Sequence, residues 1–427
     1  MRKILIIISL TILSLSLSLA IRPAIESTIK ERFARSSDSA LHNLADYQIS
    51  SPSSNPIPIS NSMSSDNNTC SIGWQIQAFF MPVESDYDGR GYAQTITIHN
   101  LNDTNNMTTR TLNSEFLENV QMQGWWGLTK QGDYIGGWDD RFWGPISSLS
   151  HLLRYPLVAG ITSGTDRSII PYGQIFTVPT LPPPWNTKTF MALEPGSDLN
   201  GKQVNIYTGM GGAAEKEKAQ ITGIENILCM HRQAPVQGDS RPTITTTNIS
   251  IGDPVYDQFD SNIVNTANQY GITDKMMIKS VIMQESFFDI FAVSSDIPCG
   301  VPDGWTDQES KSFGLMQLTP ACRAADGSKP NLTKDMNSSN WATSWFNPEY
   351  NINQGVKSLA DNLLLMKNKF SGCSDDQYML MALGAYNSGE GAIYGCSSWN
   401  DRANLYITNV TENHRILSQI ANILPSS

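Results

Sequence analysis

The sequence is poor in charged residues, and basic residues are the scarcer kind. Asp, Glu, Lys and Arg make up 16% of the 427 residues, and 40 acidic residues against 29 basic ones give a formal net charge of −11. A protein that binds nucleic acid needs a basic surface to displace the counterions of the phosphate backbone. The composition therefore argues against a nucleic-acid partner, and it says little about glycans.

Several chemistries leave no signature in the chain. The five histidines are scattered without metal-ligand spacing, and there is no HExxH motif, Walker loop or nucleophile elbow. The run from Gly209 to Ala214 formally fits a GxGxxA nucleotide fingerprint, but we expect no βαβ unit to follow it. The sequence therefore implies no metal and no cofactor.

The N-terminus carries the signature of export. Arg2 and Lys3 precede an apolar run from Ile4 to Ala20, and Ser18-Leu19-Ala20 has the small-x-small spacing that a signal peptidase cuts. The run is also nearly long enough to remain as a membrane anchor. We expect a secreted or extracytoplasmic protein, with cleavage favoured over an anchor through residues 4–20. Sequons such as Asn331-Leu332-Thr333 are compatible with glycosylation, and chance explains them equally well.

The six cysteines contain no CxxC pair. In an exported chain an even set of this kind favours disulfides over zinc. The sequence alone leaves the connectivity open. The simplest, local pairing is Cys70 with Cys229, Cys299 with Cys322, and Cys373 with Cys396.

Composition divides the chain into two folded parts. A length of 427 residues exceeds that of one compact domain. After the signal or anchor over residues 1–20, we place a Ser/Asn/Pro-rich disordered linker over residues 21–69, a β-rich domain over 70–230, a polar linker over 231–253 and a helical domain over 254–427. The expected fold class is α+β and multidomain, and a monomer is the working expectation.

Local patterns support this division. Runs such as Gln94–Ile98 and Gly173–Val178 are rich in β-branched and aromatic residues and lie between turn residues, which predicts strands. After the second linker, apolar residues recur every three or four positions, with one helix ending at Gly271 and the next capped by Thr273. The apolar positions of the three predicted helices are Tyr256, Phe259, Ile263, Ala267 and Tyr270; Met277, Ile278, Val281 and Ile282; and Val356, Leu359, Leu363 and Leu364.

Glu285 ends the second of these helices. It follows Val281 by four residues and therefore lies close to the buried stripe. In a partly apolar cleft the ionised carboxylate is disfavoured and its pKa rises, which makes the group a proton donor near neutral pH. By itself the position is weak evidence, since a Glu at a helix end is usually a solvated carboxylate.

Further motifs follow Glu285-Ser286 in a fixed order. They are Ser312-Phe313-Gly314-Leu315-Met316-Gln317, Asn347-Pro348-Glu349-Tyr350-Asn351-Ile352, Ala385-Tyr386-Asn387-Ser388-Gly389, and a late Tyr406. With the order Glu-Ser, Gly-Leu-Met-Gln, Ala-Tyr-Asn-x-Gly and Tyr, the region from about residue 255 to 424 resembles the family of soluble lytic transglycosylases and goose-type lysozymes. Four ordered motifs are far more specific than any one of them.

The resemblance implies a mainly α, lysozyme-like domain with a saccharide groove. Glu285 would protonate the bond between N-acetylmuramic acid and N-acetylglucosamine in peptidoglycan and then act as base. Attack by the muramoyl C6 hydroxyl would yield a 1,6-anhydro sugar, so no second carboxylate is needed. Tyr406 would help to stabilise the transition state. The residues implied in lining or bracing the sugar subsites are Ser312, Gly314, Leu315, Met316, Gln317, Ala385, Tyr386 and Asn387.

An acidic insertion at about residues 297–311 keeps a second outcome open. It carries Asp303, Asp307 and Glu309, and one of these near Glu285 would position a water and make the enzyme an inverting muramidase. A disulfide-pinned surface loop is the simpler interpretation. Asp289 is likewise better explained by local electrostatics.

The β-rich domain carries a thinner pattern. Its segments at 163–173, 194–202 and 205–207 resemble the three-aspartate double-psi β-barrel of the MltA type of lytic transglycosylase. Asp166 matches the first family aspartate, whereas Glu194 and Asn205 stand at the second and third. The third is the family's catalytic acid, and an amide does not donate a proton as a carboxylic acid does. The resemblance therefore implies an inactive barrel that has become a glycan-binding or positioning module.

Four tryptophans of this domain have two interpretations. Trp125, Trp126, Trp138 and Trp143 are either stacking platforms for sugar faces or parts of a hydrophobic core. The alternative to an enzyme is a catalytically silent cell-wall-binding protein built from two retired glycan folds. The presence of Glu285 with the later motifs argues against it.

Overall fold

The computed structural model describes residues 64–65, 68–101, 103, 106–147, 149, 153–194, 199–231, 249–322 and 329–424. The predicted signal or anchor, nearly all of the first linker and residues 232–248 of the second lie outside these residues. Within the described ranges, no helix combines the length and the apolar character needed to cross a membrane.

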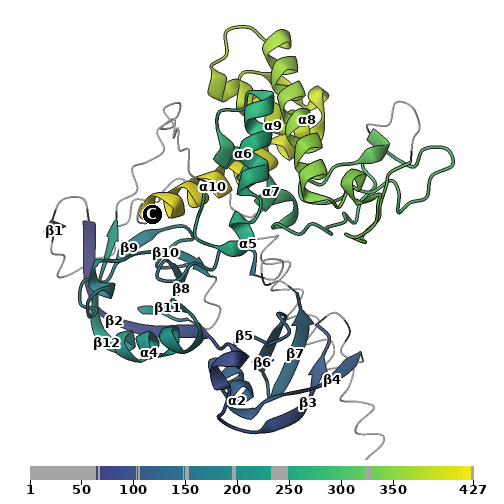
Figure 1. The fold of residues 1–427 in the computed structure, drawn as a ribbon. Helices are drawn as coiled ribbons and strands as arrows, with labels where there is room; N and C mark the ends of the chain where they lie inside the picture. The colour runs from purple at the N-terminus through teal and green to yellow at the C-terminus, as the bar shows by residue number, and fades with distance from the viewer. Residues whose placement is uncertain are drawn as a thin grey trace, which may run out of the picture. The chain divides into compact units, whose positions relative to one another are not determined.

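Seven strands of the N-terminal part form one mixed sheet. Its order is β1-β2-β11-β8-β10-β9-β12, and β12 also pairs with β2, so six of the strands close into a barrel (Figure 1). Two pairs, β2–β11 and β8–β10, are parallel. The expected β-rich domain is thus confirmed. The strands are β1 (Ser64–Ser65), β2 (Asn68–Met81), β8 (Thr162–Thr165), β9 (Ile175–Thr177), β10 (Thr189–Glu194), β11 (Gln203–Met210) and β12 (Gly223–His231).

The barrel follows from the two-residue period of its strands. On β2, Trp74, Ile76 and Ala78 are buried while Gln75 and Gln77 between them are exposed. Successive side chains of a strand point to opposite faces, so this alternation turns one face toward the core. The core also receives aromatic and aliphatic side chains from β9, β10, β11 and β12: Phe176, Phe190, Ala192, Val204, Ile206 and Leu228.

The glycine-rich run at the end of β11 leads into α4 (Gly211–Ile221), and β12 follows. Because β2 lies between β11 and β12 and runs antiparallel to β12, these strands form no parallel βαβ unit. The Asp86 carboxylate also accepts a hydrogen bond from Gly212 N (2.8 Å) at the start of α4. The helix terminus that would face a phosphate is therefore capped by the protein itself.

A second sheet, which we call the inserted sheet, lies in the chain between β2 and β8. Its strand order is β4-β3-β7-β6-β5, with α2 packed on it. Asn113 caps α2 by accepting hydrogen bonds from Glu115 N and Phe116 N, and Gly124 ends the helix in the left-handed region (φ 58°). The elements are β3 (Ala93–His99), β4 (Met107–Asn113), α2 (Ser114–Gln123), β5 (Trp126–Leu128), β6 (Tyr134–Trp138) and β7 (Arg141–Ile146).

The C-terminal part is mainly helical, as expected. Its elements are α5 (Pro254–Asp257), α6 (Asp260–Tyr270), α7 (Lys275–Ser286), α8 (Pro348–Lys369), α9 (Asp375–Ser388), the hairpin β13 (Ile393–Gly395) and β14 (Ser398–Trp399), and α10 (Asp401–Ile423). The predicted end of α6 at Gly271 is confirmed by its left-handed φ of 71°. The predicted cap of α7 is wrong by one residue. Asp274, not Thr273, caps the helix by accepting from Met277 N, and a carboxylate also suits the positive end of the helix dipole.

All three predicted disulfides are present. Cys70–Cys229 joins β2 to β12, Cys299–Cys322 spans the acidic insertion, and Cys373–Cys396 joins the start of α9 to the β13–β14 hairpin.

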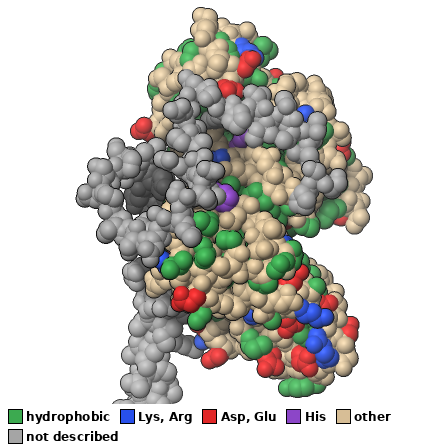
Figure 2. All heavy atoms as spheres, turned by 90° about the vertical axis from the view of Figure 1, so that its left-hand side faces the viewer, with side chains coloured by type: hydrophobic (Ala, Val, Ile, Leu, Met, Phe, Trp, Pro, Cys, Tyr) green, Lys and Arg blue, Asp and Glu red, His purple; other side chains and the backbone are tan. Residues whose placement is uncertain are grey.

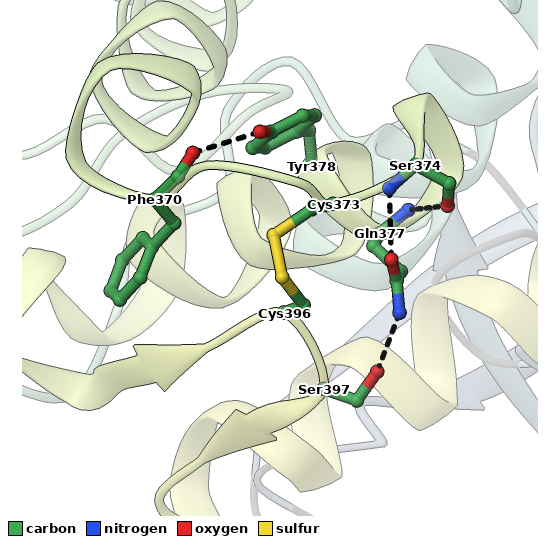
Figure 3. Close-up of a disulfide and its surroundings, with 7 residues drawn as sticks. All are labelled: Phe370, Cys373, Ser374, Gln377, Tyr378, Cys396 and Ser397. Atoms are coloured by element: carbon green, nitrogen blue, oxygen red, sulfur yellow. Dashed lines mark hydrogen bonds between the residues drawn. A yellow bond between two sulfur atoms is a disulfide. The ribbon is translucent and has the colours of Figure 1, made fainter.

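Figure 3 shows the surroundings of the Cys373–Cys396 disulfide. Ser374 and Gln377 form a capping box at the start of α9, and Gln377 Nε2 donates to Ser397 Oγ (3.0 Å). The same helix start is therefore held by a covalent bond, a cap and a hydrogen bond to the hairpin.

The surface drawn in Figure 2 carries interspersed charges. On that face the Lys and Arg side chains lie among acidic ones and form no continuous basic area.

Helix α7 carries a buried charge cluster. The Lys279 side chain is fully buried, and its Nζ donates to Asp257 Oδ1 (2.6 Å), Asp260 Oδ1 (2.8 Å) and the Ile249 carbonyl (2.7 Å). The ammonium thus has three acceptors for its three protons. Burial raises the pKa of Asp260 to about 6 although Lys279 lowers it.

Replacing Lys279 with Ala should leave two carboxylates facing a buried gap. We expect a loss of about 3–5 kcal/mol in the free energy of unfolding, measured by urea denaturation. Lys357→Ala is the control, because the ion pair of Lys357 with Asp361 is exposed and should contribute little. Equal losses in the free energy of unfolding for the two substitutions would contradict a large stabilising contribution from the buried cluster.

Candidate active site

Glu285 lies where α7 ends and the chain reverses. Phe287 and Phe288 both have positive φ angles (48° and 65°), which ends the helix at Ser286. Ser286 Oγ donates to the Leu315 carbonyl (2.8 Å). The side chain next to Glu285 therefore fixes the helix end to the Gly-Leu-Met-Gln segment.

The Glu285 carboxyl is only partly exposed and has one side-chain hydrogen bond. Tyr406 Oη, on α10, donates to Glu285 Oε1 (2.6 Å). Burial raises the pKa of Glu285 to about 7, and the Tyr406 hydrogen bond opposes this rise because it favours the ionised form. Burial also raises the pKa of Tyr406 well above 10, so the phenol stays a donor. The structure thus brings together two side chains that are 121 positions apart in the sequence.

Asn351 on α8 holds the segment that faces Glu285. Its Oδ1 accepts from Met316 N (2.8 Å), and its Nδ2 donates to the carbonyls of Phe313 (2.9 Å) and Trp345 (2.8 Å). Gly314, with φ 71°, lies so close that an added Cβ would be 2.5 Å from Asn351 Nδ2. The glycine is therefore needed for both conformation and space. The motif around Asn351 did not by itself predict this role for the residue.

The remaining motif residues brace this segment. Tyr386 Oη donates to the Met316 carbonyl (2.7 Å), and Gln317 Nε2 donates to the Gly314 carbonyl (3.0 Å). Ser312 Oγ lies 2.6 Å from Thr319 Oγ1.

Side-chain exposure separates the predicted subsite residues into two groups. The side chains of Leu315, Met316 and Ala385 are buried, so they support the site from within. Gln317, Tyr386 and Asn387 remain partly exposed. Any direct side-chain contact with a saccharide would fall to the second group.

Glu309 of the acidic insertion interacts with residues in or near the insertion. Glu309 Oε2 accepts from Thr306 N (2.7 Å), and its carboxylate pairs with Lys329 (3.1 Å). Asp289 Oδ1 accepts from Phe291 N (2.7 Å). These bonds support the interpretation of a disulfide-pinned loop for 297–311 and of a local role for Asp289. Within the described ranges, no three His, Cys, Asp or Glu side chains gather in a group suited to a metal.

The three barrel residues lie on neighbouring strands. Glu194 on β10 and Asn205 on β11 both pair with Gly164 on β8, and an added Cβ at Gly164 would lie 2.6 Å from Glu194 Oε2. Asp166 just after β8 uses its carboxylate in a turn, where it accepts from Ser168 and from Gly201 N (2.9 Å). The Ser168 hydroxyl and these backbone donors lower the pKa of Asp166.

The tryptophan cluster is largely internal. Trp126 and Trp143 are buried, and the ring of Trp138 stacks on Trp143 at 5.9 Å between centroids. Trp125 is partly buried against Phe79. The core interpretation is therefore favoured over a set of open stacking platforms.

Comparison with known proteins separates the two parts of the chain. Residues 261–403 match the family described as the transglycosylase SLT domain. Curated proteins give no match to the chain. The helical part is thus a transglycosylase SLT domain, and the resemblance predicted from its ordered motifs is confirmed. The protein is accordingly an enzyme of the lytic transglycosylase class.

Solved structures resemble the β-rich part only distantly. MltA of Escherichia coli with bound chitohexaose is 14% identical, with 39% of this chain and 76% of that chain covered and a TM-score of 0.31. A membrane-bound lytic murein transglycosylase from Agrobacterium tumefaciens is 15% identical, with coverages of 38% and 76% and a TM-score of 0.24. LtgG, a lytic transglycosylase of Burkholderia pseudomallei, is 12% identical, with coverages of 40% and 75% and a TM-score of 0.22.

Tyr406→Phe removes the hydroxyl that donates to Glu285 Oε1 and keeps the aromatic ring. Because this hydrogen bond favours the carboxylate, its loss should raise the pKa of Glu285 further above about 7. The alkaline limb of the dependence of kcat/KM on pH, where Glu285 loses the proton that it must donate, should move in the same direction, with kcat reduced. Tyr378→Phe, which removes a hydroxyl bonded to the Phe370 carbonyl, is the control and should leave the profile unchanged. A profile that stays fixed in Tyr406→Phe would contradict the assignment.

The raised pKa of Glu285 also predicts how stability changes with pH. The folded protein keeps this proton up to about pH 7, whereas the unfolded chain releases it near 4.5, so the wild type loses stability as pH rises between these values. Glu285→Gln removes that loss and should gain up to roughly 3 kcal/mol over the wild type between pH 4.5 and 8, by urea denaturation. The exposed Glu349→Gln serves as control. A difference independent of pH would show that Glu285 is not protonated in the folded state.

Proposed function

We propose that the protein cleaves the β-1,4 bond between N-acetylmuramic acid and N-acetylglucosamine in peptidoglycan, with Glu285 as the single acid and base. The observation that carries this proposal is the Glu285–Tyr406 pair. It combines a carboxyl with a pKa near 7 and a neutral donor on the same oxygen. A group of this pKa is available in both protonation states near neutral pH.

The reaction can be written without water. Protonated Glu285 gives its proton to the glycosidic oxygen, the bond from that oxygen to the muramoyl C1 breaks, and N-acetylglucosamine leaves with a new hydroxyl. The Glu285 carboxylate then takes the proton of the muramoyl C6 hydroxyl, whose oxygen bonds to C1. The product is a 1,6-anhydro sugar, and Glu285 returns to its protonated form.

Tyr406 supports the second half of this cycle. Its hydrogen bond to Oε1 stabilises the carboxylate that exists between the two proton transfers. It also fixes one carboxyl oxygen and leaves Oε2 to exchange the proton. In this scheme Tyr406 stabilises the transition state indirectly, by stabilising the negative charge on Glu285.

The surroundings of Glu285 favour this reaction over inverting hydrolysis. A hydrolase of that kind places a second carboxylate opposite the acid to activate a water. The Glu309 carboxylate is instead bound to Thr306 and Lys329. The rise in the pKa of Glu285 comes from burial, with the Tyr406 hydrogen bond opposing it, and no neighbouring carboxylate contributes to it.

We assign the barrel a supporting role. Asn205 stands beside Glu194 across Gly164 and supplies an amide where catalysis by a barrel of this kind needs an acid. The three disulfides fit a protein that works outside the cytoplasm.

Glu285→Gln should lower the cleavage of purified peptidoglycan by at least about 10²- to 10⁴-fold, because the amide neither donates nor accepts the proton. Mass spectrometry of the wild-type products should show 1,6-anhydro-muramoyl ends. Asn205→Ala is the matched control and should cleave normally.

Each other outcome selects a different function. Reducing muramoyl ends would indicate a muramidase. Normal cleavage by Glu285→Gln would assign the acid elsewhere, and the absence of any product from the wild type would favour a cell-wall-binding protein.

A further inference from the structure

The inserted sheet carries a groove that no part of the proposed reaction uses. It has a volume of about 200 Å³ and lies between the start of β3, α2 and β7. Leu117 and Phe142 supply its apolar part and are buried (2% and 8% exposed). Pockets that enclose a whole ligand measure roughly 300–1,000 Å³, so this groove suits one ring of a longer ligand.

An exposed aromatic ring stands at the groove. Tyr92 is 69% exposed, the largest exposed fraction of any aromatic residue among the exposed large hydrophobic side chains of the described residues. A ligand that covers the Tyr92 ring would remove apolar surface from water, which is favourable, and the face of an aromatic ring suits the C–H face of a sugar.

The backbone of Tyr92 is fixed despite the exposure of its side chain. Tyr92 N donates to Ser114 Oγ (3.0 Å), and the Tyr92 carbonyl accepts from Ser114 N (2.9 Å). Asn113 Nδ2 donates to the Arg90 carbonyl (2.6 Å), and Gly91 takes a positive φ of 65°. The ring is therefore presented from a preorganised turn, which lowers the entropy lost on binding.

Polar side chains line the groove next to this ring. They are the amides of Gln94 and Gln121 and the carboxylate of Glu118. Within the part of the chain that the structure describes, none of the three side chains makes a hydrogen bond to another protein group. Two amides and one acceptor beside an aromatic face can bond the hydroxyl and acetamido groups at the edge of a sugar ring.

We propose that this groove is a saccharide-binding site, in which one N-acetylhexosamine ring stacks on Tyr92 and bonds to Gln94, Gln121 and Glu118. Glu118 and the absence of a lysine or arginine from the lining favour an uncharged sugar over an anionic ligand. The proposal deepens the proposed function, because it supplies a second contact with the same polymer. Two sites on one chain hold a glycan strand more tightly than either alone.

The test uses the full chain in the Glu285→Gln background, so that the ligand is not consumed. Calorimetric titration with a soluble β-1,4-linked N-acetylglucosamine hexamer should give two sites per chain. Adding Tyr92→Ala should leave one site and weaken sedimentation with purified peptidoglycan roughly five- to tenfold. Tyr92→Phe keeps the ring and should bind nearly as the parent does. Met107→Ala is the matched control, because Met107 is a half-exposed apolar residue on β4 of the same sheet.

Three results would overturn the proposal. They are the same number of sites in the parent and in Tyr92→Ala, equal binding by Tyr92→Ala and Met107→Ala, or a loss in Tyr92→Phe as large as in Tyr92→Ala. Circular dichroism verifies that the variants are folded. Failure of the proposed function would look different, since anhydro-muramoyl ends would be missing from digests with Tyr92 intact while Tyr92→Ala still removed one site from the hexamer titration.

Discussion

The burial of the Glu285 carboxyl at the end of α7 is the constraint around which the candidate site of the helical domain is arranged. Its proton is retained near neutral pH because Glu285 is surrounded by protein, and the Tyr406 hydrogen bond keeps that burial from abolishing the ionised form. The rest of the domain maintains this balance. Asn351 fixes the facing segment, and Ser286 joins that segment to the helix. A buried polar network of this kind is useful only when each member has its partners.

The two folded parts differ in how many ionisable side chains they bury. The barrel is a closed sheet whose interior is apolar, and Glu194 and Asn205 flank Gly164 on its neighbouring strands. The helical domain accepts the cost of a buried lysine and a partly buried glutamate on one helix. Such costs are typical of the parts of a protein that carry out its function.

Much of the helical domain could be predicted from sequence, because its signals are local. The three-to-four periodicity gave α6, α7 and α8, and the ordered motifs gave Glu285 and Tyr406 as candidates. The cap of α7 was misplaced because Thr273 and Asp274 are both good caps and only geometry selects Asp274. The role of Asn351 in holding the Gly-Leu-Met-Gln segment could not be predicted, because a single buried asparagine leaves no periodic pattern in the sequence. The presence of a second, inserted sheet could not be predicted from the sequence. Strands of either sheet show the same alternation of apolar and polar residues, and which strands pair is decided by contacts between residues far apart in sequence.

The pairing of Cys70 with Cys229 has a consequence for the history of the chain. The polypeptide enters the barrel on β2 and leaves it on β12 at directly paired positions, with Cα atoms 3.9 Å apart. A unit that starts and finishes at one point can be gained or deleted by recombination without rerouting the segments on either side. The inserted sheet lies within the barrel's own sequence, between β2 and β8. The architecture is therefore nested, with one sheet inside a barrel whose two chain ends are joined by the Cys70–Cys229 bond.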